Sequence, residues 1–200
     1  MSIEEEYEMI PKMTTQESPA DFLNNILKEK KETQQKETQQ KEYLVSIDGF
    51  SKNNKTGFSV KFEKHNSFDI TKVLNKKHIN IYAQYIGLLS AFLTIHQNYT
   101  RFLSNKIVII IDNMIIIKSI TKFGKKWMEN GFIKADGTEV KNKEIIKQIL
   151  VLKDELEKNS IQISFKYISK DLSKPNINNP QFDIWNMKNI VYSNVQEILN

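Results

Sequence analysis

Apolar and polar positions divide the chain into a globular body, which begins near residue 43, and a polar segment before it. Five segments have strand patterns, either alternation or a continuous β-branched run, at residues 43–50, 57–63, 67–71, 106–112 and 161–168. Helical spacing of apolar residues predicts helices at residues 80–96, from 114 onward, at 124–129, 142–158 and 182–199. Ala83 and Gly87 give the first of these helices a small-residue stripe that permits close packing on a sheet.

The order of these elements predicts an α/β fold. The first three strands follow one another through short turns, which is typical of an antiparallel meander. The last two strands are each reached through a helix, so we expect them to join the sheet in parallel. The sequence therefore predicts a mixed five-stranded sheet with helices on both faces, formed by residues 43–200.

Residues 1–42 have a different character. Pro19 lies in the first turn of a possible short helix, and the pentapeptide KETQQ then occurs twice in succession at residues 31–40. This repeat holds no apolar residue and cannot bury surface, so we interpret it as a linker, either disordered or a solvated helix. The short helix before it could dock a protein partner, and an unstructured tail is the alternative.

Composition narrows the class of protein. The chain has no cysteine, which excludes disulfides, zinc fingers and thiol catalysis. Neither a signal peptide nor an apolar run long enough to span a bilayer is visible, so we expect a cytoplasmic or other intracellular protein without a membrane partner. We also expect a monomer. The net charge of +5 suits a polyanionic partner. Abundant Lys, Asn and Ile also fit the codon bias of an AT-rich genome, and both explanations remain open.

Three carboxylates interrupt apolar patterns. Asp48 lies within the first strand, Asp112 ends the fourth, and Asp183 opens the last helix. If the first and fourth strands are neighbours, Asp48 and Asp112 meet at the carboxyl edge of the sheet, where α/β folds place their sites. Such a cluster favours hard divalent cations. Each residue also has a structural explanation, an Asp-Gly turn for Asp48 and helix caps for the other two.

Residues 43 to about 190 resemble type 1 ribonuclease H. The resemblance rests on an Ile-Asp-Gly at residues 47–49 and on the segments NKIVIIID at 105–112, IKSIT at 117–121, KWMENGF at 126–132 and GTEVKNK at 137–143. It implies the ribonuclease H fold and a site with two Mg²⁺ or Mn²⁺ ions. Within that site the first, third and fourth family carboxylates correspond to Asp48, Asp112 and Asp183, and Asn179 supports the last.

The second family carboxylate, a glutamate, is replaced in this chain. The pattern Asn-x-x-Ala-Glu is matched by Asn80-Ile-Tyr-Ala-Gln84, so Gln84 stands in the catalytic set as a neutral ligand. We expect this replacement to weaken one of the two metal ions. It is consistent with an enzyme of low activity, an altered one or an inactive one.

Residues that face the substrate in the family are better retained. The resemblance assigns Asn80 to the RNA 2′-hydroxyl, and Lys77 and Asn142 to a DNA phosphate. Asn179 is also expected among the residues that bind nucleic acid. The remaining matches form a basic and aromatic excursion that packs on the DNA strand: Phe123, Lys125, Lys126, Trp127 and Lys134. Local packing is the alternative explanation of the aromatic residues.

Two functions follow as hypotheses. The first is an enzyme that binds RNA/DNA hybrid or a related duplex and hydrolyses the RNA strand by two-metal phosphodiester cleavage, with activity reduced by Gln84. The second is a catalytically lapsed ribonuclease H-like subunit that binds nucleic acid or acts as a scaffold. The retention of three carboxylates favours the enzyme.

Overall fold

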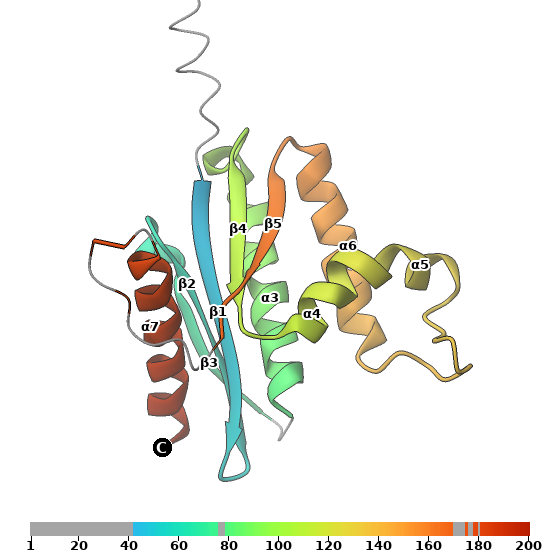
Figure 1. The fold of residues 1–200 in the computed structure, drawn as a ribbon, viewed down its shortest axis with the longest axis horizontal. Helices are drawn as coiled ribbons and strands as arrows, with labels where there is room; N and C mark the ends of the chain where they lie inside the picture. Colours follow the sequence, from blue (N-terminus) through green and yellow to red (C-terminus); the bar gives the residue numbers. More distant parts are fainter. Residues whose placement is uncertain (1–41, 76–78, 170–174, 176–177, 180) are drawn as a thin grey trace, which may run out of the picture. The chain divides into compact units, whose positions relative to one another are not determined.

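The computed structural model describes residues 42–75, 79–169, 175, 178–179 and 181–200 (Figure 1). Residues 1–41 of the expected N-terminal tail, and Lys77, lie outside these residues, whereas Glu42 belongs to the first strand. No helix in the described part of the chain is both long and apolar enough to cross a membrane.

Five strands form one sheet in the order β3-β2-β1-β4-β5. They are β1 (Glu42–Lys52), β2 (Lys55–Phe62), β3 (Ile70–Leu74), β4 (Lys106–Ile111) and β5 (Gln162–Tyr167). The first three pair antiparallel, whereas β4 runs parallel to both β1 and β5. The predicted mixed sheet is confirmed.

The third strand begins later than its sequence pattern indicates. We expected residues 67–71, but Asn66–Phe68 form a 3₁₀ turn and the strand starts at Ile70. The Asp69 carboxylate accepts a hydrogen bond from the Phe62 backbone N–H at 2.8 Å. This contact holds the chain in a turn next to β2, so pairing begins only after it.

Helices cover both faces of the sheet, as predicted (Figure 1). They are α3 (Asn80–Gln97), α4 (Met114–Lys118), α5 (Gly124–Glu129), α6 (Lys143–Lys158) and α7 (Phe182–Leu199), with a π-helical turn, Ser119–Phe123, between α4 and α5. Ile109 of β4 belongs to the main core with α3 and α6, whereas Ile110 packs with Ile184 of α7. Because successive strand residues point to opposite faces, α7 covers the face opposite α3.

Small residues let α3 lie very close to β1. A Cβ atom added to Gly87 would lie 2.8 Å from Ile47 Cγ2, and one added to Gly49 would lie 2.5 Å from the backbone nitrogen of Gln84. Both distances are shorter than ordinary packing contacts. The expected small-residue stripe is thus confirmed, and it places Gln84 directly against the end of β1.

Candidate functional site

Asp48 and Asp112 lie side by side at the carboxyl edge of the sheet. In the parallel pairing of β1 with β4, Ser46 is the partner of Ile110, so the same register two residues further places Asp48 opposite Asp112. Asp48 is 0 % exposed and the side chain of Asp112 only 2 %. Two buried carboxylates on neighbouring strands repel each other unless hydrogen-bond donors or cations lie between them.

Gln84 supplies hydrogen-bond donors to both carboxylates. Its Nε2 lies 2.7 Å from Asp112 Oδ1 and 3.2 Å from Asp48 Oδ1. Asp48 Oδ1 also accepts from the Gly49 backbone N–H at 2.8 Å. Gln84 is buried, so these bonds are shielded from competing water.

Asn113 fixes the orientation of this amide. The Ile115 backbone N–H donates to Asn113 Oδ1 at 3.1 Å, which caps α4 and turns the Asn113 amide nitrogen toward Gln84. Asn113 Nδ2 then donates to Gln84 Oε1 at 2.8 Å. Gln84 must therefore present its nitrogen, not its oxygen, to the carboxylates. The expectation that Gln84 offers an oxygen to a metal stays a prediction; in this structure that oxygen accepts a hydrogen bond from Asn113.

Lys188 lies on the other side of the carboxylate pair. Its Nζ is 3.4 Å from Asp48 Oδ2 and 3.4 Å from Asp112 Oδ2, and it donates to the Ile47 carbonyl oxygen at 3.1 Å. The contact with Ile47 is a hydrogen bond, and the contacts with the two carboxylates are ion pairs. Lys188 is only 5 % exposed, so the charge is held inside the protein.

Asp183 does not join the pair, which corrects the expected three-carboxylate cluster. It is exposed in the first turn of α7, and no three His, Cys, Asp or Glu side chains in the described ranges form a group that could hold a metal ion. Helix geometry explains this, since residues 183 and 188 lie about 140° apart around the helix axis. The face of α7 that carries Lys188 packs on the sheet.

These residues do not fit the two-ion arrangement that the family resemblance implies. Divalent ions of the Mg²⁺ type require oxygen ligands, several of them anionic. Here the Oδ1 atoms of both carboxylates accept hydrogen bonds from Gln84, and the Lys188 ammonium lies 3.4 Å from both Oδ2 atoms. We therefore assign no hydrolytic step to this site.

The sequence analysis missed Lys188, although the pattern of α7 carried a signal. Ile184, Lys188, Val191 and Val195 are buried at spacings of four, three and four residues, which define one helix face. A lysine in the middle of such an apolar stripe indicates a buried ammonium group with anionic partners, because an unpaired buried charge is very unfavourable. Asn113 gave no comparable signal.

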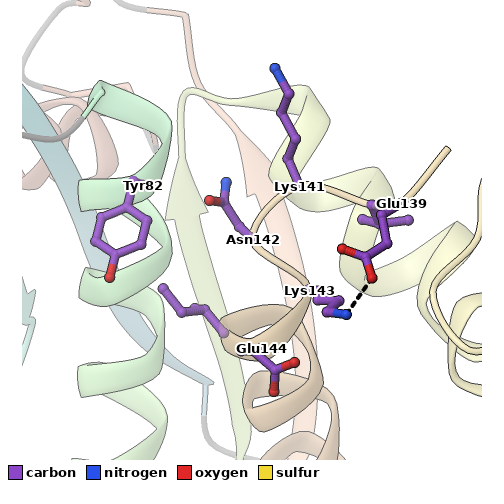
Figure 2. Close-up of a pocket in the computed structure, with 8 residues that line it drawn as sticks. Tyr82, Glu139, Lys141, Asn142, Lys143 and Glu144 are labelled. Carbon is purple, nitrogen blue, oxygen red and sulfur yellow. Dashed lines mark hydrogen bonds and ion pairs between the residues drawn. The ribbon is translucent and has the colours of Figure 1, made fainter.

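A hollow of about 340 Å³ lies between α3 and the start of α6 (Figure 2). Tyr82 of α3 lines one side, and residues 139–145 line the other. Asn142, which we expected to contact a DNA phosphate, borders this hollow. It adopts a left-handed backbone conformation (φ 61°) immediately before α6, which asparagine tolerates well. Lys141 and Lys143 flank it, and Lys143 pairs with Glu139.

A second hollow, of about 460 Å³, lies around α5 and is lined by residues between 123 and 135. Its lining includes four of the residues that we expected to contact the DNA strand: Phe123, Lys126, Trp127 and Lys134. The rings of Phe123 and Trp127 pack at 5.5 Å between centroids. Lys134 Nζ donates to Thr138 Oγ1 at 2.8 Å, and Lys125 is exposed. A β-bridge between residues 133 and 139 joins the segments that line the two hollows.

The two remaining asparagines have different surroundings. Asn80 is exposed at the first turn of α3, and its Oδ1 accepts from the Ser51 backbone N–H at 2.8 Å. This bond ties the start of α3 to the end of β1, close to Asp48. Asn179 Oδ1 accepts from the Gln181 backbone N–H at 2.9 Å. Asn179 thus stabilises the turn before α7.

Comparison with solved structures identifies the fold. A foamy viral protease–reverse transcriptase in complex with dsDNA matches at 16% identity with a TM-score of 0.51, over 78% of this chain and 94% of that chain. LC11-RNase H1, isolated from compost, matches at 16% identity and 0.51, over 80% and 99%. The foamy viral enzyme in complex with RNA/DNA hybrid matches at 13% and 0.52, over 94% of this chain and 22% of that chain.

No protein-family model and no curated protein sequence matches the chain. The structural likeness, at these low identities, is a likeness of fold. It agrees with the strand order, the mixed pairing and the helices on both faces. The chain has the ribonuclease H fold.

Proposed function

We propose that this protein binds RNA/DNA hybrid duplexes along the surface that holds the two hollows, and that it does not hydrolyse them. Two observations carry the proposal: Gln84 and Lys188 contact the carboxylate pair from either side, and basic and aromatic side chains line a hollow around α5. Of the two hypotheses drawn from the sequence, we thus favour the catalytically lapsed binder.

The substrate-facing residues support a hybrid ligand. Because the Oδ1 of Asn80 is held by Ser51, the amide Nδ2 is the group that would donate to an RNA 2′-hydroxyl. The hollow at Asn142 would receive a phosphate of the DNA strand, and the Phe123–Trp127 pair with its lysines would contact the same strand further along. Contacts of this kind bind the backbone without reading base sequence.

Lys188 also explains why two carboxylates persist in a protein without hydrolysis. From the sequence alone, a lapsed site would have less reason to keep them than an active one. Inside the protein, however, Asp48 and Asp112 neutralise a buried ammonium group that also donates to β1. Their role is then structural, since loss of either would leave Lys188 with one fewer partner.

Duplex binding and cleavage separate the two hypotheses. Purified protein would be titrated into fluorescently labelled RNA/DNA hybrid, dsDNA and dsRNA, with millimolar Mg²⁺ or Mn²⁺, and the RNA strand examined on a denaturing gel. We expect salt-sensitive binding that favours the hybrid, and intact RNA. RNA cleavage that is lost in Asp48→Asn would contradict the proposal, and so would an absence of duplex binding.

Lys126→Ala is expected to weaken hybrid binding uniformly across sequences. If Lys126 neutralises one phosphate, the slope of log affinity against log salt should fall by about one. Lys147→Ala is the matched control, because Lys147 is exposed on α6 and lines neither hollow. Fluorescence anisotropy over a range of salt concentrations measures both slopes. Equal slopes for the two variants would place the DNA strand elsewhere.

A further inference from the structure

We infer that the Lys188 ammonium is a resident cation, which occupies the electrostatic position of a divalent ion and makes the carboxylate pair independent of metal. The inference deepens the proposed function and rests on it only for the absence of hydrolysis. It assigns to this chain a self-contained Asp48–Lys188–Asp112 centre, in which α7 supplies the cation and the sheet supplies the anions.

The contacts divide the four carboxylate oxygens into two sets. The two Oδ1 atoms accept from the single Gln84 amide, and the two Oδ2 atoms both lie 3.4 Å from the single Lys188 ammonium. Each donor group therefore bridges the pair. Such a bridge does what a shared metal ion would do, since it holds two like charges together in a site of low dielectric.

The Ile47 carbonyl oxygen distinguishes this arrangement from an ordinary ion pair. Lys188 Nζ donates a hydrogen bond to it at 3.1 Å, in addition to its ion pairs with Asp48 and Asp112 at 3.4 Å. The carbonyl belongs to a residue with no exposed surface in the middle strand of the sheet. Lys188 is thereby held from inside the protein, and it could not turn outward without losing its hydrogen bond to this buried carbonyl oxygen.

A divalent ion would have to displace groups that the chain itself tethers. On one side it would meet the N–H groups of Gln84, which Asn113 holds in place. On the other side it would meet a positive charge that is almost fully buried. An intramolecular ammonium competes at a high effective concentration, and its departure would break the hydrogen bond to the Ile47 carbonyl oxygen. We therefore expect no binding of divalent cations at the pair.

Mn²⁺ titration of the full-length protein, without nucleic acid, tests the inference. Free Mn²⁺ is followed by electron paramagnetic resonance, and thermal unfolding is compared in Mn²⁺ and in EDTA. We expect no Mn²⁺ bound at the pair and the same melting temperature in both. Weak binding that persists unchanged in Asp112→Asn belongs to surface carboxylates and agrees with the inference. Binding that Asp112→Asn abolishes would overturn it.

A double variant tests whether removal of the ammonium group allows the carboxylates to bind a divalent ion. Lys188→Met with Gln84→Glu removes the ammonium and adds a third carboxylate, which creates the anionic set that divalent ions prefer. We expect it to gain a Mn²⁺ site and to melt at least several degrees higher in Mn²⁺ than in EDTA, whereas Lys147→Met should behave as wild type. A folded double variant that binds no Mn²⁺ would overturn the inference. If it does not fold in either condition, the wild-type titration decides.

The two proposals can fail independently. A protein that binds Mn²⁺ at the pair but also binds hybrid would refute the resident cation and leave duplex binding intact. A protein that binds neither Mn²⁺ nor any of the duplexes would agree with the inference about Lys188 and would refute the proposed function.

Discussion

Lys188→Met should destabilise the domain by about 3–5 kcal/mol, the usual loss when one partner of a buried ion pair is removed. The substitution leaves Asp48 and Asp112 next to each other with no cation, and it leaves the Ile47 carbonyl oxygen without its donor from α7. Methionine has a similar length and is apolar, so little packing is lost. Urea unfolding at neutral pH, followed by circular dichroism, measures the change in the free energy of unfolding.

A double-mutant cycle separates this electrostatic effect from packing. Adding Asp112→Asn to Lys188→Met removes one of the two repelling charges, so the double variant should be more stable than Lys188→Met alone. Residues in direct contact commonly couple by about 0.5–3 kcal/mol. Lys147→Met is exposed on α6 and should change stability by less than about 0.5 kcal/mol. If the effects of Lys188→Met and Asp112→Asn simply add, the ammonium group is not paired with Asp112.

Gly49→Ala should destabilise the domain by about 2–3 kcal/mol, although alanine in place of glycine often stabilises a protein. The new Cβ would lie 2.5 Å from the Gln84 backbone nitrogen and 2.6 Å from the Ala83 carbonyl carbon. Backbone atoms in a helix cannot move aside singly, so α3 as a whole would have to shift away from β1. That shift would also lengthen the hydrogen bonds from Gln84 to the carboxylates.

Gly87→Ala gives the comparison for this effect. Its Cβ would meet the Ile47 Cγ2 atom at 2.8 Å, and a side chain can adjust more easily than a helix backbone. We expect a smaller loss of stability than for Gly49→Ala in the same urea unfolding experiment. A Gly49→Ala variant as stable as the wild type would mean that α3 does not approach β1 as closely as described.

The sheet could be predicted from sequence because its signals are local or follow from chain order. Alternation marked β1, the β-branched run marked β4, and short turns required antiparallel neighbours whereas helical connections required parallel ones. The position of Asp48 opposite Asp112 followed from the same rules. The displaced start of β3 could not be foreseen in this way, because it depends on a contact from Asp69 back to β2.

The chemistry at the pair was harder to predict, since it depends on how elements distant in sequence rotate against each other. Which face of α7 meets the sheet decides that Lys188, not Asp183, reaches the carboxylates. Which end of the Gln84 amide meets them is decided by Asn113, twenty-nine residues later in the chain. The family resemblance implies four positions for the site, and Lys188 is not one of them.

A crystal structure from crystals soaked in Mn²⁺, with anomalous data collected at the manganese edge, tests the central claim most directly. We predict no anomalous peak between Asp48 and Asp112, with Lys188 Nζ in contact with both carboxylates and with the Ile47 carbonyl oxygen. A manganese peak coordinated by the two carboxylates, with Lys188 turned away from them, would contradict the account.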